Sequence, residues 1–183
     1  MKIPASLDYF YQYAFPMPTV LVTCNDEQGR TNIVTVAWHT TLSRKPPLYG
    51  ISLASKRYSY ELINKTKEYA LNFIPYELAA QAQFCGTHTG RKTEKTRETN
   101  LTLVVAKKIR VPLIKEAYAH LECRLQREER VGDHILLVGE VVAVQIEENV
   151  FQNDILQIQK MQPLFYLGEN SYTTVDTTKK HEF

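Results

Sequence analysis

Two long stretches of alternating apolar and polar residues follow one another in the C-terminal half of this chain. The first, HLECRLQREERV, covers residues 120–131, and the second, HILLVGEVVAVQIEE, covers residues 134–148. A period of two is typical of a β-strand with one buried face, and the dipeptide Gly132-Asp133 between the stretches is typical of a turn. The sequence therefore predicts a long antiparallel hairpin, and the rest of the fold must provide a sheet that accommodates it.

Shorter runs rich in β-branched residues predict further strands. These are expected at residues 19–24, 31–38, 48–54, 69–74, 163–168 and 172–175. Apolar residues at helical spacing predict two short helices, one over residues 59–66 with Ser59 as its cap and one over residues 77–85. Residues 149–160 fit either a helix or an extended linker. This pattern favours a mainly β fold with short helices, a closed or nearly closed antiparallel barrel, over a doubly wound sheet with regularly alternating helices.

Composition limits the class of protein. The chain has 183 residues, of which 44% are hydrophobic, and this suits a single domain over residues 1–183. The three cysteines Cys24, Cys85 and Cys123 lack the spacing of a disulfide framework or a zinc site, so no metal site is predicted. The chain has no apolar run of about 18 residues and no signal-peptide pattern at its N-terminus, so we expect a cytoplasmic protein without a membrane partner.

A nucleic-acid-binding barrel is a remote alternative. The basic run KKIR at residues 107–110 and the eleven tyrosines could contact phosphates and stack on bases. However, 22 basic and 20 acidic residues leave a net charge of only +2, and acids such as Glu94 and Glu98 are interspersed among the cations. The field that nucleic-acid binding needs is therefore weak, and no nucleic-acid partner is predicted.

The stretch FCGTHTGRKTEKT, residues 84–96, combines two glycines with several cations and is typical of an anion-binding loop. It comes close to the mononucleotide pattern GxxxxGK[ST], but its glycines are one residue too close and it follows a predicted helix, so an ATP site is rejected. Thr89, Arg91 and Lys95 offer a hydroxyl, a bidentate fork and a point charge to one phosphate. A solvated cationic loop is the simpler alternative.

Three other stretches place polar side chains near strand ends or a helix start. They contain Asn32, Thr35, Trp38, His39 and Thr40; Ser52, Lys56, Arg57, Tyr58 and Ser59; and His134. The simpler interpretations are a half-buried strand with Trp38 in the core, a plain helix cap, and a surface hairpin histidine. No arrangement typical of hydrolysis is present. An anion site with few catalytic side chains indicates that a phosphorylated cofactor supplies the chemistry.

Taken together, these stretches resemble the flavin reductase-like, FMN-binding split-barrel family, and most closely its flavoredoxin branch. Family motifs are matched at Asn32, Thr35 and Trp38, at residues 52–63, at Thr89, Gly90, Arg91 and Lys95, at residues 132–141, and at residues 163–172. The resemblance covers about residues 19–175, and the motifs follow one another in the same order as in the family. Each motif alone is weak, but five of them in this order are specific.

The resemblance implies a Greek-key barrel that forms a homodimer and binds FMN non-covalently near the subunit interface. The phosphate is then expected at Arg57, Thr89, Arg91 and Lys95, and the isoalloxazine ring against residues 37–40 and 52–54. The full set of cofactor-binding residues expected is Asn32, Thr35, Ala37, Trp38, His39, Thr40, Ser52, Leu53, Ala54, Arg57, Tyr58, Ser59, Thr89, Gly90, Arg91, Lys95 and Tyr172.

The activity that the resemblance implies is an NAD(P)H:flavin oxidoreductase, with NADH or NADPH as reductant and His134 as the catalytic candidate near the ring or the reductant. An FMN electron carrier that is reduced by a redox partner protein is the alternative. A flavin-storing or sensing module without turnover is a third. The sequence alone does not separate these roles.

Overall fold

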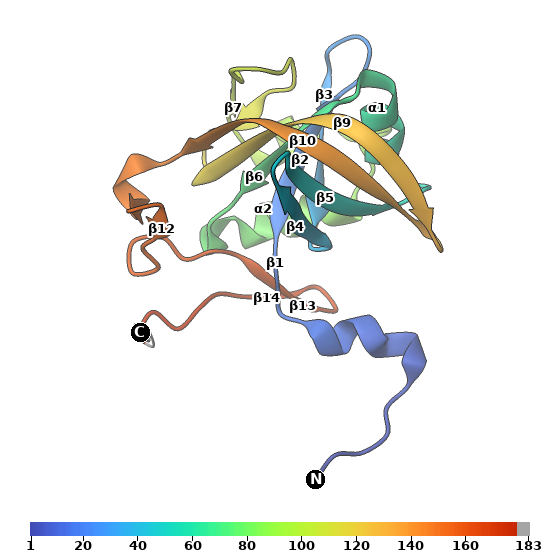
Figure 1. Cartoon of the computed structure of the whole chain (residues 1–183), viewed down its shortest axis with the longest axis vertical. Coiled ribbons are helices and arrows are strands. Elements are labelled where there is room, and N and C mark those ends of the chain that lie inside the picture. Colours follow the sequence, from blue (N-terminus) through green and yellow to red (C-terminus); the bar gives the residue numbers. More distant parts are fainter. Residues whose placement is uncertain (179–183) are drawn as a thin grey trace.

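The computed structural model describes residues 1–178, and its centre is a seven-stranded antiparallel sheet that curls into a split barrel (Figure 1). In the sheet the strand order is β3-β2-β6-β9-β10-β5-β4. Its strands are β2 (Val20–Asn25), β3 (Thr31–Val36), β4 (His39–Arg44), β5 (Pro47–Ala54), β6 (Glu68–Phe73), β9 (Ala119–Val131) and β10 (His134–Ile146). The predicted mainly β barrel with short helices is confirmed.

The long hairpin is confirmed, with β9 and β10 joined at Gly132, whose φ of 62° suits a tight turn. β10 pairs with β5 on its other side, so the hairpin connects the two halves of the sheet. Residues 37–38 lead directly from β3 at one end of the sheet into β4 at the other, and the backbone N–H of Ser52 donates to the carbonyl of Trp38 at 2.9 Å in continuation of the β4-β5 pairing. This bond lies just beyond the end of β3, where the strand predicted over residues 31–38 stops at Val36.

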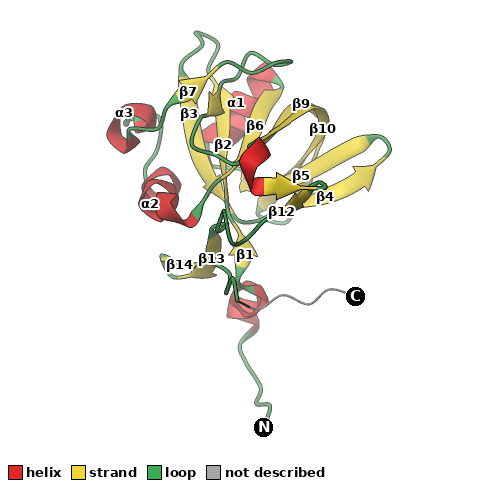
Figure 2. Cartoon of the chain, turned by 90° about the vertical axis from the view of Figure 1, so that its left-hand side faces the viewer, coloured by secondary structure: helices red, strands yellow, loops and turns green. Residues whose placement is uncertain are grey.

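Within the described residues 1–178, three α-helices and three 3-10 helices accompany the strands. The helices are α1 (Tyr58–Thr66), α2 (Ala79–Thr87), α3 (Lys95–Thr99), η1 (Leu7–Ala14), η2 (Tyr76–Leu78) and η3 (Glu148–Val150). α2 and α3 lie together beside β3, on one side of the barrel (Figure 2). The predicted cap at Ser59 is wrong: α1 begins at Tyr58 with Arg57 as its N-cap, and the Ser59 hydroxyl accepts a hydrogen bond from the Asn32 amide instead.

The remaining strands are short and lie outside the barrel sheet. They are β1 (Met17–Pro18), β7 (Leu103–Val104), β8 (Leu113–Ile114), β11 (Phe151–Gln152), β12 (Ile155–Leu156), β13 (Phe165–Gly168) and β14 (Ser171–Thr173). β11 and β12 form a tight hairpin through Asn153 and Asp154, both at positive φ, so residues 149–160 are neither a helix nor an extended linker. β1, β13 and β14 form a small sheet between the barrel and η1 (Figure 1).

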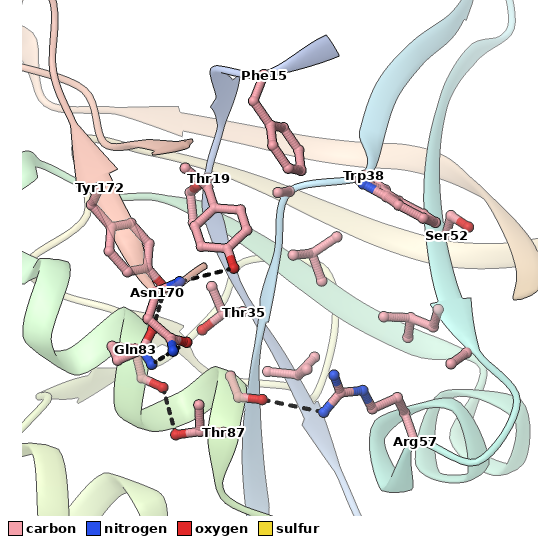
Figure 3. Close-up of a pocket in the computed structure, with 17 residues that line it drawn as sticks. Phe15, Thr19, Thr35, Trp38, Ser52, Arg57, Gln83, Thr87, Asn170 and Tyr172 are labelled. Carbon is pink, nitrogen blue, oxygen red and sulfur yellow. Dashed lines mark hydrogen bonds between the residues drawn. The ribbon is translucent and has the colours of Figure 1, made fainter. Parts of the chain in front are cut away.

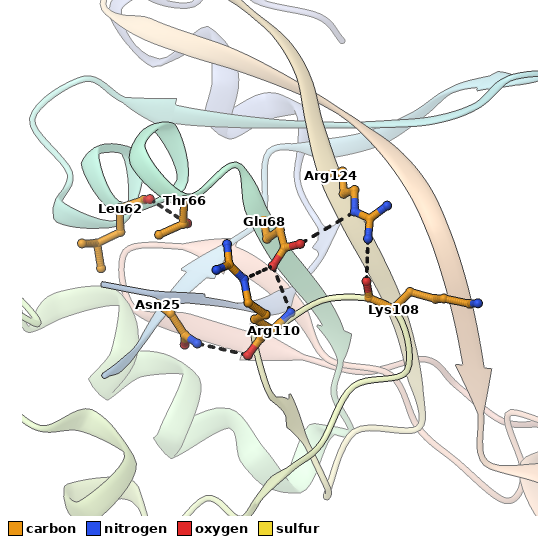
Figure 4. Close-up of polar contacts among 7 residues, drawn as sticks. All are labelled: Asn25, Leu62, Thr66, Glu68, Lys108, Arg110 and Arg124. Carbon is orange, nitrogen blue, oxygen red and sulfur yellow. Dashed lines mark hydrogen bonds and ion pairs between the residues drawn. The ribbon is translucent and has the colours of Figure 1, made fainter. Parts of the chain in front are cut away.

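The basic run at residues 107–110 is tied to the barrel by carboxylates. Glu68 accepts the Arg110 backbone N–H at 2.9 Å and lies 3.7 Å from the Arg124 guanidinium, which also donates to the Lys108 carbonyl (Figure 4). The fully buried Glu122 accepts the backbone N–H groups of Lys107 and Lys108. These contacts anchor the backbone of the run to strands β6 and β9, so the run has a structural role.

Candidate functional site

The first of two adjoining cavities, the Trp38 cavity, has a volume of about 320 Å³ and opens where β3 ends. Its walls come from the 34–38 segment, the end of β5, α2 and the β13-β14 sheet (Figure 3). The lining residues are Phe15, Thr19, Val34, Thr35, Val36, Ala37, Trp38, Ser52, Leu53, Ala54, Arg57, Gln83, Gly86, Thr87, Tyr166, Asn170 and Tyr172. Apolar and aromatic walls with a few amide and hydroxyl groups suit a flat organic ligand.

Trp38 lies at the wall of this cavity and not in the barrel core. The chain leaves the strand at Ala37, and the Trp38 ring packs against Tyr11 at 5.8 Å and against His134 at 4.8 Å between ring centroids. The structure therefore does not support the simpler interpretation that Trp38 fills the core. An indole held between two neighbouring rings provides a fixed apolar surface for a ligand.

A polar chain of side chains faces Trp38 across the cavity. The Tyr172 hydroxyl donates to the Gln83 carbonyl oxygen at 3.1 Å, and the Gln83 amide donates to the Asn170 side chain at 2.8 Å (Figure 3). Burial, and less strongly the nearby Tyr166 and Cys85, raises the pKa of Tyr172 to about 12, so its hydroxyl stays protonated at neutral pH. These groups can orient a ligand by hydrogen bonds without carrying charge.

The second cavity, the Lys95 cavity, has a volume of about 330 Å³ and is cationic. Its lining residues are Asn32, Val34, Lys56, Arg57, Tyr58, Ser59, Cys85, Thr87, His88, Thr89, Gly90 and Lys95. The N-terminus of α1 faces it, and this helix has no side-chain cap, so its first N–H groups remain available to an anion. Such a set of cations, a hydroxyl and helix N–H groups is typical of a phosphate site.

Lys95 is almost fully buried, at 4% exposure, and its ammonium is fixed by the protein. The Nζ atom donates to the carbonyls of Ile33 and Cys85, both at 2.7 Å, which leaves one of its three protons free. Burial lowers the pKa of Lys95, and the neighbouring Arg57 adds to this effect, whereas Cys85 and Cys24 oppose it. A bound anion would stabilise the charged form of Lys95, and the charged ammonium would in turn attract the anion.

Gly90 allows the loop after α2 to lie against β3. A Cβ at this position would come within 2.0 Å of the Asn32 side-chain oxygen. That oxygen is buried and has no hydrogen-bond partner among residues 1–178. The close approach explains why glycine is needed here, and it brings Thr89 and the loop backbone to the rim of the Lys95 cavity.

The two cavities form one elongated site. They share Val34, Arg57 and Thr87 as lining residues, and Arg57 donates to the Gly86 carbonyl at 3.2 Å between them. No aspartate or glutamate of the described chain lines either cavity, whereas Lys56, Arg57 and Lys95 do. The site therefore has an aromatic, uncharged end and a cationic end, as an anionic ligand with a flat apolar part requires.

Four of the predicted site residues lie outside this site. They are His39, Thr40, Arg91 and His134. Thr40 is exposed on β4. The His39 Nε2–H donates to the Pro18 carbonyl at 2.9 Å, so its Nδ1 accepts from the Tyr49 hydroxyl at 2.7 Å, and burial lowers the pKa of His39. Its ring is thus neutral and engaged in the structure at physiological pH.

Arg91 and His134 border the site without lining it. The Arg91 guanidinium lies 4.5 Å above the Tyr58 ring and pairs with Glu61, because α1 presents both side chains on that side. The His134 Nδ1 atom lies 2.8 Å from a carboxylate oxygen of Asp133, and the His134 ring packs against Trp38. The His134 contact holds the pKa of the Asp133 carboxyl below its usual range. Arg91 is therefore separated from the Lys95 cavity by Tyr58, and His134 is one ring away from the Trp38 cavity.

Several lining residues were not anticipated from the sequence. They include Phe15, Thr19, Gln83, Gly86, Thr87, Tyr166 and Asn170. They come from segments about 150 residues apart, which the fold brings together. The sequence held a signal for some of them. Gly86 and Thr87 lie in the stretch 84–96 that is typical of an anion-binding loop, and Gly168-Glu169-Asn170 is a turn, with all three residues at positive φ, in which Asn170 contacts Gln83.

The fold and the site define a split antiparallel barrel with a bipartite cavity that is aromatic at one end and cationic at the other. The chain belongs to the flavin reductase like domain family, whose pattern matches residues 12–174. Membership of this family makes a flavin-linked redox role the general function of the chain. Within residues 1–178, no helix is long and apolar enough to cross a membrane.

Known proteins from several organisms are similar to this chain. An uncharacterized protein of Archaeoglobus fulgidus is 38% identical over 133 residues, which is 73% of this chain and 74% of that protein. The crystal structure of an FMN-binding protein from Thermus thermophilus with bound 1-cyclohex-2-enone has 29% identity and a TM-score of 0.83, covering 100% of this chain and 98% of that one. A flavoredoxin from Methanosarcina acetivorans has 27% identity and a TM-score of 0.84, covering 96% and 92%.

Proposed function

We propose that this protein binds FMN non-covalently and is an NAD(P)H-dependent flavin oxidoreductase. The observation that carries the proposal is the pair of adjoining cavities. Among the described residues, the first has aromatic and apolar walls with Arg57 as its one charged lining residue, and the second is lined by Lys56, Arg57 and Lys95 and by no carboxylate. Together they match a planar ring system joined to a phosphate. The similarity to an FMN-binding protein and to a flavoredoxin supports the same ligand.

The residues present fit the phosphate of FMN at the Lys95 cavity. Arg57 and Lys95 would neutralise its charge, the Thr89 hydroxyl would donate to it, and the α1 N-terminus would add backbone N–H groups. Arg91 was expected in this set, but Tyr58 and Glu61 hold it in a neighbouring cavity, so we assign it no contact with the FMN phosphate.

The Trp38 cavity would hold the ring of the cofactor. Trp38 and Leu53 offer apolar surface, and the Gln83 and Tyr172 side chains offer hydrogen-bonding groups to the ring edge. When bound, FMN supplies the hydride and electron transfer, and the protein supplies binding, orientation and electrostatics. His134 lines neither cavity but packs against Trp38 and contacts Asp133, and we propose it as the residue that orients the reductant or holds a proton near the ring.

The experiment that tests this proposal is anaerobic reduction of the purified protein. After incubation with FMN and removal of the excess, the protein is expected to be yellow, and NADH or NADPH should bleach the flavin absorbance. A flavin that stays bound but is bleached only by dithionite would favour the electron carrier reduced by a partner protein. A protein that retains no flavin would contradict both roles.

We further propose that the protein is a homodimer. The arm formed by η1 buries none of its own residues and exposes large apolar side chains, among them Leu7 and Phe10 at 85% and 67%. Such a surface is typical of a segment that another chain covers, and the family resemblance indicates a second copy. Light scattering with flavin bound should give the mass of a dimer, and a monomer mass at micromolar concentration would contradict it.

A further inference from the structure

One wall of the Trp38 cavity comes from segments outside the barrel sheet. This Tyr166 wall consists of Phe15 before β1, Tyr166 on β13 and Asn170 in the turn between β13 and β14. The Tyr166 ring lies 5.4 Å from the Phe15 ring and 5.2 Å from the Tyr172 ring, between centroids. The flavin ring is proposed beside Trp38, on the barrel side of the cavity, so the Tyr166 wall offers a second aromatic surface to another flat molecule.

The hydrogen bonds at the Tyr166 wall leave two donors without a partner among residues 1–178. The Tyr172 hydroxyl donates to the Gln83 carbonyl oxygen, which turns the Gln83 NH₂ group toward the Asn170 side-chain oxygen at 2.8 Å (Figure 3). The Asn170 NH₂ group is therefore the first of these donors. The Asn170 backbone N–H donates to the Tyr166 hydroxyl oxygen at 3.4 Å, so the Tyr166 O–H is the second. A ligand at this wall needs an oxygen or nitrogen atom that accepts hydrogen bonds.

The Tyr166 wall favours an uncharged and small ligand. Among the described residues that line the Trp38 cavity, Arg57 is the one charged residue, and it lies at the end shared with the Lys95 cavity. An ionised molecule at the Tyr166 wall would lose its hydration without gaining a counter-ion. The cavity volume of about 320 Å³ has to hold the flavin ring as well, so the remaining space suits a molecule much smaller than a second flavin.

We propose that the Tyr166 wall binds the final electron acceptor and that this acceptor is a small quinone. The proposal rests on the proposed function, because reduced flavin must supply the electrons. The Asn170 NH₂ group and the Tyr166 O–H donate to a carbonyl oxygen of the quinone, and the Phe15 and Tyr166 rings contact its ring. A quinone fits because it is flat, presents carbonyl oxygens, and is uncharged both before and after reduction.

The electron balance of this step is that of a two-electron reduction. The quinone takes up two electrons and two protons and becomes a hydroquinone. A hydride from FMN that NAD(P)H has reduced carries both electrons and one proton. The second proton comes from the Tyr166 hydroxyl, which lies at the proposed carbonyl position and regains a proton from water.

The first test measures binding without turnover. Oxidised, FMN-loaded protein is titrated with duroquinone, an uncharged and fully substituted benzoquinone, in an isothermal titration calorimeter. The variants are Tyr166→Phe and Asn170→Ala, and the matched control is Tyr76→Phe, a change at an exposed tyrosine that lines neither cavity. Each of the two variants should bind duroquinone roughly threefold to tenfold more weakly than the wild type, because each loses one hydrogen bond, and the control should match the wild type.

The second test follows oxidation of the flavin in an anaerobic stopped-flow instrument. FMN-loaded protein, reduced with one equivalent of dithionite, is mixed with duroquinone or with ferricyanide, a multiply charged anion without carbonyl groups. The oxidation rate should saturate with duroquinone concentration and should fall in Tyr166→Phe. The rate with ferricyanide should be the same in the wild type and in Tyr166→Phe, because this oxidant would not use the Tyr166 wall.

The outcomes separate this inference from the proposed function. Protein that holds FMN but does not bind duroquinone, or that binds it equally well in the wild type and both variants, would overturn the quinone site and leave the proposed function intact. A loss of FMN affinity in Tyr166→Phe and Asn170→Ala as large as the loss for duroquinone would also overturn it, because it would assign both side chains to the flavin. Failure of the wild type to retain FMN would overturn both.

Discussion

Arg57 lies where the two cavities of the proposed FMN site meet. We expect its replacement by alanine to weaken the binding of FMN more than the binding of riboflavin. One guanidinium N–H donates to the Gly86 carbonyl at 3.2 Å, and the other donors remain free for a phosphate. A hydrogen bond to a charged group contributes about 1.5–3 kcal/mol, and about 1.4 kcal/mol corresponds to a tenfold change in affinity. Because Arg57 is exposed, we expect the lower end of this range, a loss of roughly tenfold.

The assay is quenching of flavin fluorescence, with FMN and riboflavin titrated in parallel. Riboflavin lacks the phosphate, so Arg57→Ala should change its affinity by less than about threefold, and Arg57→Lys should restore only part of the FMN affinity because an ammonium has no planar fork. The matched control is Arg44→Ala, a change at an exposed arginine of β4 that lines neither cavity. Equal losses for FMN and riboflavin in Arg57→Ala would refute the assignment of the phosphate to the Lys95 cavity.

Three further outcomes follow from the site and its surroundings. Gly90→Ala should lower the free energy of unfolding by about 1–3 kcal/mol in urea denaturation and should weaken FMN binding, because the new Cβ would overlap the Asn32 oxygen. Gly86→Ala, whose Cβ would lie 3.4 Å from Thr35, should lower the free energy of unfolding less, and equal losses of stability in the two variants would contradict this. His134→Ala should slow flavin reduction by NADH or NADPH in stopped-flow measurements more than it weakens FMN binding. Unchanged reduction rates would support the simpler interpretation of His134 as a surface hairpin residue. The free energy of unfolding should fall as the pH drops below about 6.5, because burial lowers the pKa of His39 and of His120 in the folded chain and the unfolded chain takes up the protons first. His39→Gln should remove the His39 part of this slope, and an unchanged slope would argue against a neutral His39 ring.

Much of the barrel was predictable because alternation along a strand is a local signal. Alternation marks the β9-β10 hairpin, whereas short runs of β-branched and apolar residues mark the β2-β3 hairpin and strands β5 and β6. Strands β2, β3 and β6 are in fact buried along almost their whole length. The 3-10 helix η1 was not predicted, although Leu7, Phe10, Tyr11 and Ala14 recur at helical spacing, and in the structure it buries none of its own residues. The β11-β12 hairpin was missed because its turn uses Asn153 and Asp154 in place of glycine.

The site was predictable only where a single segment carries the chemistry. The start of α1 and the loop after α2 place Arg57, Thr89 and Lys95 in one cavity, and the end of β5 contributes Ser52 and Leu53 to the other. The sequence could not show that hydrogen bonds to the Pro18 carbonyl and the Tyr49 hydroxyl would hold the His39 ring outside the site, since these two residues are distant from His39 along the chain. It also could not show that Tyr58 would separate Arg91 from the Lys95 cavity, because this depends on how the loop packs against α1.

The most direct test of the account is a crystal structure of the protein with FMN bound. We predict that the phosphate lies in the Lys95 cavity within hydrogen-bond distance of Arg57 and Lys95, and that the isoalloxazine ring lies in the Trp38 cavity beside Trp38 and Leu53. A phosphate held beside Arg91 and Lys92, or a flavin ring bound away from Trp38, would contradict the account.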